Sequence, residues 1–387
     1  MAYSVMINCL TLAASALFAI APSSSAAQSL PTVDGPEAAG LVKQVSGYIV
    51  MNGGGEKDAP DGLIIAFALP SMKSRVVRGS PERHSSDFPT VHAVSGPDAE
   101  GRIAYIEDHF FVANEKNRRH LLKVIQLDGT KDTELFSRPG DAMWAASRGG
   151  GIGHGLAISP AHGRIAFLSG LRNAQMPGAL LSVGSIEVWD IATKTGHKVD
   201  VNAVDHSLCW FPDGNRLAYV ELVDGEEAPK SSPDLGDFGS GFKNWGRVPA
   251  VHVLDVDTGK SSFLHIGWEP VVSAGGKTVL VQDIDYRLRM VKAEDKTSEA
   301  VQVPGYWGRS LAVLEGNLAL YWGLPTKGSK ARYTKHNSPL VGSKPMPSIK
   351  LAEIGSQKFQ TVIPYVDPRD RISFGAVKAR TPSESKQ

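Results

Sequence analysis

Five side chains suited to ligand recognition stand near the start of strand-like segments in this chain. Two of them are related by an internal alignment, because His154 lies five residues before Ser159 and His206 lies five residues before the equivalent Phe211. An arginine offers a bidentate fork to an anion, and a tryptophan offers a flat face for stacking. We therefore predict an opening that receives an anionic or carbohydrate-like ligand. Its candidate residues are His92, His154, His206, Trp268 and Arg309.

The three histidines of this ring leave three interpretations open. Neutral imidazoles are common ligands of transition metals, so His92, His154 and His206 are candidate metal ligands. The second interpretation is a ligand pocket without a metal, and the third is an imidazole that bonds the backbone at each strand start. We predict no cofactor, with a divalent metal ion as the alternative, and we assign no catalytic residue.

A second candidate region is the insertion at about 224–249. Its aromatic residues Phe238, Phe242 and Trp245 suit a lid or a contact with a partner protein, because exposed aromatic side chains often anchor interfaces. An ordinary surface loop explains them equally well. The acidic residues of this insertion do not follow the spacing of a calcium-binding loop.

Repeated segments must position these residues. The segments 158–169 (ISPAHGRIAFLS) and 210–221 (WFPDGNRLAYVE) align with each other, and 94–107 and 272–283 align more loosely. Each joins two strands through a turn that contains glycine. A second strand–turn–strand pattern follows, as in 251–264 (VHVLDVDTGKSSFL). Together the two patterns give four antiparallel strands per unit, which is the blade of a propeller.

The repeats predict an all-β fold, a six-bladed β-propeller of four-stranded antiparallel blades over residues 45–377. The first unit lacks its opening strand, and the strand-like run 371–377 has no partner in the last unit. We expect this C-terminal strand to join blade 1 and close the ring, which removes open sheet edges. The expected blades are about 46–79 with 371–377, 89–138, 152–201, 205–266, 267–303 and 306–364.

The connections differ between the two faces of the expected ring. Turns between the first and second strands, and between the third and fourth, share one face and are short; we call it the short-turn rim. Loops between the second and third strands, and between blades, share the long-loop rim. Binding residues concentrate on long loops, so we expect function on the long-loop rim. The long loops are expected at 52–62, 108–120, 170–184, about 224–249 and about 323–347.

The repeat residues resemble those of a known family. Ser159-Pro160 followed by 163–167 (GRIAF), and 211–219 (FPDGNRLAY), are similar to the SPDG-x-x-[IL]-[AV]-[FY] repeats of TolB-like propellers, of the PD40 or WD40-like type. The turn at 255–260 (DVDTGK) resembles the D-x-x-T-G-[KE] turn of the same repeats. The resemblance implies a six-bladed propeller without the TolB N-terminal domain. Similar propellers precede the hydrolase domain of prolyl-oligopeptidase-like enzymes, but this sequence has no G-x-S-x-G elbow, so we expect no peptidase domain.

The family resemblance implies a fold and withholds a function. Oligogalacturonate lyases carry similar propeller repeats and bind a metal through histidines near the centre. Their clustered ligand motif has no clear local match in this sequence.

The N-terminus has the layout of a secretory signal peptide. Residues 9–21 are apolar or small and uncharged, and Ser25 and Ala27 place small residues before a cleavage site at Gln28. The apolar run is shorter than the roughly 20 residues that span a bilayer. We expect a signal peptide at 1–27, a linker at 28–44, a disordered tail at 378–387, no transmembrane segment after cleavage, and a periplasmic or secreted protein.

Composition narrows the function further. The 387 residues carry a net charge of +1, with 42% hydrophobic and 21% charged residues, which suits a soluble globular protein and argues against nucleic-acid binding. Signal cleavage leaves Cys209 as the one cysteine, for which we expect a small buried thiol. The best-fitting function is an exported, monomeric scaffold that binds a protein or a small-molecule or glycan ligand. The alternative is a propeller enzyme, a lyase or hydrolase acting on a glycan or peptide in the central funnel.

Overall fold

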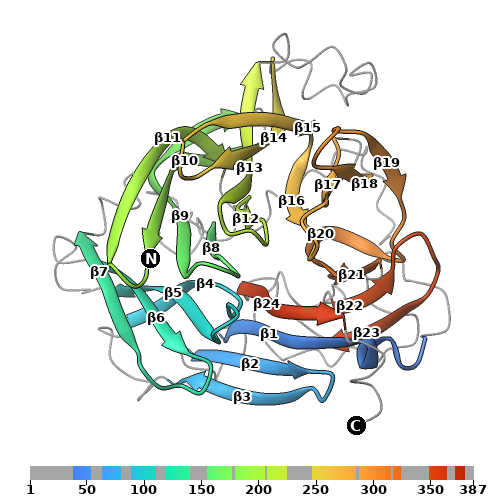
Figure 1. Ribbon diagram of the computed structural model, residues 1–387, viewed down its shortest axis with the longest axis horizontal. Coiled ribbons are helices and arrows are strands. Elements are labelled where there is room, and N and C mark those ends of the chain that lie inside the picture. Colours follow the sequence, from blue (N-terminus) through green and yellow to red (C-terminus); the bar gives the residue numbers. More distant parts are fainter. Residues whose placement is uncertain are drawn as a thin grey trace, which may run out of the picture.

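The structure is a computed structural model of the chain. Within the part that it describes, the chain forms 24 β-strands and one short 3₁₀ helix, and no α-helix. Figure 1 shows the strands as antiparallel sheets arranged in a ring, so the predicted all-β, propeller-like architecture is confirmed. No described helix is long and apolar enough to cross a membrane. The structure describes residues 38–53, 63–79, 89–109, 119–139, 155–176, 179–204, 207–224, 246–284, 287–314, 317–323, 348–363 and 371–379.

Four of the sheets have four strands each, and η1 (Leu41–Gln44) precedes the first of them, within the predicted linker. The first sheet contains β24 (Arg371–Ala379), β1 (Val45–Gly53), β2 (Leu63–Leu69) and β3 (Lys73–Arg78). The second contains β4 (Pro89–Val94), β5 (Arg102–His109), β6 (Arg119–Gln126) and β7 (Thr133–Pro139). The third contains β16 (Trp268–Val272), β17 (Thr278–Gln282), β18 (Leu288–Lys292) and β19 (Ser298–Val301). The fourth contains β20 (Tyr306–Leu314), β21 (Leu318–Gly323), β22 (Ser348–Glu353) and β23 (Phe359–Ile363).

The fifth sheet has eight strands, where two separate four-stranded sheets were expected. It contains β8 (Leu156–Ile158), β9 (Arg164–Met176), β10 (Ala179–Asp190), β11 (Thr195–Val204), β12 (Cys209–Trp210), β13 (Arg216–Asp224), β14 (Arg247–Asp255) and β15 (Ser261–Ile266). β11 runs far enough to meet β13, and the pair Ala203 and Glu221 joins the two halves. The prediction of six equal four-stranded sheets is therefore corrected to four such sheets and one of eight strands among the described residues.

Six strands lie closest to the centre of the ring in Figure 1, and we call them the inner strands: β4, β8, β12, β16, β20 and β24. They contact one another in series, from β24 to β4, β8, β12, β16 and β20, and from β20 back to β24. β24 also pairs antiparallel with β1, from the pair Val45 and Ala379 to the pair Asn52 and Arg371. Strands from the two ends of the described chain thus share one sheet.

The repeated D-x-x-T turn on the short-turn rim has one hydrogen-bond pattern. Asp255 Oδ1 accepts bonds from the backbone N–H of Thr258 at 2.9 Å and from its hydroxyl at 2.8 Å. Asp190 Oδ1 accepts the same two bonds from Thr193, at 2.8 and 3.0 Å. These bonds stabilise the ionised carboxylates and lower the pKa of both aspartates. The recurring sequence pattern therefore reflects a recurring turn geometry.

Tyrosines at one repeated strand position fill the space between sheets. Tyr105 on β5, Tyr219 on β13 and Tyr321 on β21 are at most 1% exposed. A buried tyrosine needs a partner for its hydroxyl. Tyr105 donates to Asp132 at 2.8 Å, Tyr219 bonds a serine hydroxyl at 2.9 Å, and Tyr321 donates to the carbonyl oxygen of Pro304 at 2.5 Å. Each of these three buried hydroxyls therefore has a hydrogen-bond partner.

Two predicted long loops are shorter than expected. β9 and β10 stay paired out to Met176 and Ala179, so most of 170–184 is strand, because two antiparallel strands can continue their hydrogen bonds beyond a sheet as a ribbon. Asp108 and His109 likewise end β5 rather than begin a loop. β24 continues to Ala379, two residues into the predicted tail. The predicted signal peptide 1–27 and the remainder of the tail lie outside the described residues.

Candidate functional site

The predicted ring residues lie on the inner strands or directly before them. His92 is in β4 and Arg309 is in β20, but the side chains of both are outside the described part of the chain. His154 and His206 directly precede described residues and are themselves outside them. The described part of the structure shows no contact between predicted ring side chains. Phe238, Phe242 and Trp245 of the predicted lid also lie outside it.

Trp268 is the one ring residue whose side chain the structure describes. It begins β16, pairs with Gln282 of β17 and is partly buried. Its side chain packs against the apolar cluster that contains Phe211, Val272 and Val281. Trp268 therefore contributes to packing between neighbouring sheets, which is a structural role beside the predicted ligand contact.

Three inner strands are irregular at the end that begins on the long-loop rim. The pairing of β4 with β5 shifts at His92, that of β16 with β17 shifts directly after Trp268, and that of β20 with β21 shifts directly before Arg309. Glu269, inside the second shift, has a φ of 47°, which is uncommon for a residue other than glycine. A bulge bends a strand and redirects its side chains, and bulges are frequent beside functional sites. Each of the three shifts adjoins a predicted ring residue, and shifts also occur in outer pairings such as those of β2 with β3, β14 with β15 and β22 with β23.

A buried carboxylate at the end of β5 is a functional feature that the sequence reasoning missed. The side chain of Glu107 is 4% exposed, and Arg78 Nη2 of the neighbouring sheet donates to its Oε2 at 2.6 Å. Lys123 Nζ lies 3.6 Å from the same oxygen, and His109 Nε2 contacts Oε1. Three basic side chains therefore surround one carboxylate near the end of β5. We call these four residues the Glu107 cluster.

The Glu107 cluster can do two things chemically. The pair of Arg78 and Glu107 ties the sheet of β1 to the sheet of β5. The carboxylate also orients the imidazole of His109, whose side chain is 29% exposed, and a histidine held in this way is a typical general acid or base. The alternation of Tyr105, Glu107 and His109 along one strand face was a signal that could have found this cluster.

Another histidine–carboxylate pair lies on the opposite face of β5. Asp108 and His120 are cross-strand partners, with Oδ1 and Nδ1 3.9 Å apart and side chains 2% and 0% exposed. Their burial keeps them from any ligand in solution, so we assign them a structural role.

Neither a metal site nor a reactive thiol is visible in the described part of the chain. No group of three or more His, Cys, Asp or Glu side chains there could hold a metal ion. Burial raises the pKa of the Cys209 thiol to about 11, although the N–H of Val272 donates to its sulfur at 3.3 Å and opposes this. The thiol is therefore protonated at neutral pH and unreactive.

Comparison with known proteins finds neither a protein-family model nor a curated protein that matches this chain. Among solved structures, the chain is similar to TolB from Acinetobacter baumannii, with 12% identity, 87% of this chain and 66% of that chain covered, and a TM-score of 0.49. It is also similar to an acylaminoacyl peptidase from Pyrococcus horikoshii, with 15% identity, coverage of 71% and 39%, and a TM-score of 0.40. For an oligogalacturonate lyase in complex with manganese, the identity is 14%, the coverage 77% and 72%, and the TM-score 0.43.

The chain spans less than two thirds of the length of the first two of these proteins. Because every one of these TM-scores is below 0.5, the likenesses carry no assignment of ligand, metal or activity to this chain. The all-β ring therefore rests on the strand pairing described above.

Proposed function

We propose that this chain is an exported β-propeller that binds a ligand or a partner protein on its long-loop rim, around the starts of the inner strands. The proposal counts six blades, because a single residue pair joins the two halves of the eight-stranded sheet. It also takes the ring as closed, which the series of contacts among the inner strands and the pairing of β24 with β1 support. Closure would bring residues far apart in sequence around one opening.

The bulges in β4, β16 and β20 are the observation that carries the proposal. They adjoin His92, Trp268 and Arg309, which the repeat alignment selected independently of any strand pairing. Bulges are frequent beside functional sites, so a bulge next to each of three candidate residues favours a site rather than a neutral variation in loop length. The mixture of imidazole, indole and guanidinium favours an anionic or carbohydrate-like ligand.

Calorimetric titration with two oligosaccharides of equal length tests this site. Hexagalacturonate carries carboxylates and maltohexaose is uncharged. We expect the Arg309→Gln variant to bind hexagalacturonate at least about tenfold more weakly, a loss of about 1.4 kcal/mol, because it removes a charge-assisted contact. Arg75→Gln is the matched control, since Arg75 is exposed on the outer strand β3. The proposed ligand class is wrong if the wild-type protein binds neither sugar, or if Arg75→Gln weakens binding as much.

The metal alternative has a separate measurement. If the site is metal-free, as we propose, elemental analysis of the purified protein should find no divalent metal ion in stoichiometric amount. Stoichiometric manganese, zinc or calcium that is lost in a His154→Ala/His206→Ala variant would replace the metal-free pocket with a metal site.

A propeller enzyme is the second candidate function, and the contact between Glu107 and His109 favours it. An imidazole oriented by a carboxylate is suited to proton transfer in a lyase or a hydrolase. Prolonged incubation with hexagalacturonate, followed by chromatography of the products, tests for turnover. The scaffold proposal predicts intact substrate. Cleavage of hexagalacturonate would show that the protein is an enzyme. Loss of cleavage in His109→Gln, with binding of hexagalacturonate retained, would assign the proton transfer to His109.

A further inference from the structure

A pocket opens on the short-turn rim, on the side opposite to the proposed ligand site. Its volume is about 250 Å³, and it lies between the outer strands β14 and β15 and the turn that joins β18 to β19. At about 30 Å³ for each water molecule in the liquid, this space equals roughly eight waters. The pocket therefore has room for a small ligand.

The charge of the pocket is positive. Arg216, Lys260 and Lys296 line it together with one carboxylate, that of Asp255. The Asp255 carboxylate already accepts two hydrogen bonds within its own turn, which lower its pKa. Arg216 pairs through Nε with Asp213 at 2.6 Å and its guanidinium lies 4.4 Å from the centre of the Phe211 ring, while its two Nη groups make no hydrogen bond to a described residue. Neither lysine ammonium has a carboxylate within ion-pair distance in the described part of the chain.

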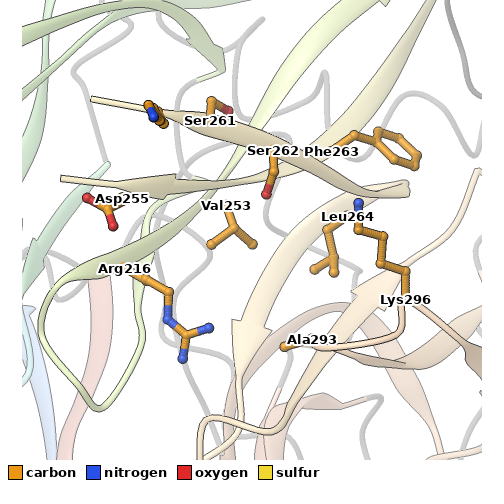
Figure 2. A pocket seen from close by; sticks show the side chains of 10 residues that line it. Arg216, Val253, Asp255, Ser261, Ser262, Phe263, Leu264, Ala293 and Lys296 are labelled. Atoms are coloured by element: carbon orange, nitrogen blue, oxygen red, sulfur yellow. The ribbon is translucent and has the colours of Figure 1, made fainter. Parts of the chain in front are cut away.

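The wall of the pocket combines a hydroxyl with apolar side chains. Ser262 of β15 lies directly opposite Val253 of β14 in the strand pairing, so the two side chains point to the same side of the sheet. Figure 2 shows Ser262, Val253 and Leu264 between Arg216 from the same sheet and Lys296 from the neighbouring one. The Ser262 hydroxyl makes no hydrogen bond to a described residue. Cationic groups, a hydroxyl and apolar side chains therefore line a single recess.

We propose that this recess binds a small organic anion. Its phosphate or carboxylate group is held by Arg216, Lys260 and Lys296, and its apolar part lies on Val253 and Leu264. Guanidinium and ammonium groups form short, charge-assisted hydrogen bonds with phosphate and carboxylate oxygens, and the guanidinium fork matches their planar geometry. The site is built from two neighbouring sheets and shares no residue with the proposed site on the long-loop rim. The two proposals can therefore fail independently.

Calorimetric titration with three related probes tests the recess: phenyl phosphate, benzoate and benzyl alcohol. We expect one molecule of phenyl phosphate or benzoate to bind, with an affinity that falls as salt is added, and no detectable binding of benzyl alcohol. A preference for phenyl phosphate identifies a phosphate ligand, and a preference for benzoate identifies a carboxylate. The Lys260→Gln/Lys296→Gln variant should bind the preferred anion at least about tenfold more weakly.

Lys277→Gln/Lys292→Gln is the matched control, because it also removes two exposed lysine charges near the same turn but neither residue lines the pocket. We expect it to bind within about twofold of the wild-type protein, since screened charges outside the recess contribute little. The proposal is overturned if no anion binds at millimolar concentration, or if the control variant loses as much affinity as the test variant. Hexagalacturonate binding to both variants should be unchanged, which separates this site from that on the long-loop rim.

Discussion

The short-turn rim carries one repeated turn, whereas the long-loop rim carries the Glu107 cluster and the bulges that adjoin predicted ring residues. On the short-turn rim, a threonine donates its N–H and its hydroxyl to the aspartate of each of four turns. These aspartates are Asp128, Asp190, Asp255 and Asp295. On the long-loop rim, three inner strands are bulged and the Glu107 cluster buries a carboxylate among three basic groups. Irregular features of this kind cost stability, so proteins retain them mainly at functional or strained sites.

The contrast between the rims separates stability from binding. Changes to the Asp–Thr bonds of the repeated turns should alter folding a little and leave hexagalacturonate binding on the long-loop rim unchanged. Changes to the ring residues should alter binding without altering folding.

Removing β24 should have the largest effect. A chain that stops after residue 364 leaves β1 as an open sheet edge, although Ile49 and Val50 in β1 are fully buried in the intact protein. Exposing such side chains costs about 1.5–3 kcal/mol each. We expect the unfolding free energy, measured by urea denaturation, to fall by about 3 kcal/mol or more. A chain that stops after residue 380 keeps β24 and is the control. Equal stability of the two truncated chains would show that β24 does not hold the ring together.

Replacing the buried carboxylate of the Glu107 cluster should have the next largest effect. Glu107→Gln removes the carboxylate that Arg78 contacts at 2.6 Å, whereas Lys123 keeps its pair with Asp132 at 3.1 Å; both cations are mostly buried. Breaking a fully buried ion pair costs 3–5 kcal/mol, and we expect about 2 kcal/mol here because both cations keep some contact with water. Glu100→Gln is the matched control, since Glu100 is 68% exposed and its pair with Arg102 should contribute less than about 0.5 kcal/mol. Similar unfolding free energies for both variants would show that the Arg78–Glu107 pair does not stabilise the contact between the two sheets.

A turn variant on the short-turn rim should have a small effect that depends on pH. Asp255→Ala removes the acceptor of the Thr258 bonds and should cost less than about 1 kcal/mol at pH 7, because the carboxylate is solvent-exposed. The pKa of Asp255 is lower in the folded protein than in the unfolded chain, so below about pH 4 the unfolded chain binds more protons than the folded protein does. The stability that the ionised carboxylate contributes is therefore lost as the pH falls. The difference between the wild-type protein and Asp255→Ala should therefore shrink from pH 6 to pH 2.5. A pH-independent difference would mean that the charge of Asp255 does not contribute.

The ring histidines should have the smallest effect on folding. If His154 and His206 face a ligand opening, His154→Ala/His206→Ala should change the unfolding free energy by less than about 1 kcal/mol. If each imidazole instead bonds a buried backbone group, the double variant should lose about 1–3 kcal/mol for each group left unsatisfied. Urea denaturation distinguishes the two results. A large loss of unfolding free energy would show that the two histidines have a structural role and do not bind the ligand.

The features that could be predicted from the sequence are the local ones. Asp255 and Thr258 are three residues apart, so a short segment of sequence is enough to predict the turn that they form. The repeated strand patterns indicated the all-β ring. The eight-stranded sheet could not be predicted in this way. It depends on how far β11 extends before Ala203 meets Glu221, and no local pattern specifies that length.

The described chemistry of the candidate sites was less accessible from the sequence. The Glu107 cluster needs Arg78 from another sheet, and the pocket on the short-turn rim needs Lys296 from another sheet. Contacts between sheets depend on register and packing, which a single sequence does not reveal. Of the five ring residues, the alignment indicated the strand starts but not the packing of Trp268 against Phe211.

Hydrogen–deuterium exchange with and without hexagalacturonate tests the contrast between the rims most directly. The long-loop site predicts slower exchange at the starts of β4, β16 and β20, and no change in the turn from Asp255 to Thr258. Protection confined to the short-turn rim, or protection that survives in the Arg309→Gln variant, would contradict the central claim that hexagalacturonate binds on the long-loop rim.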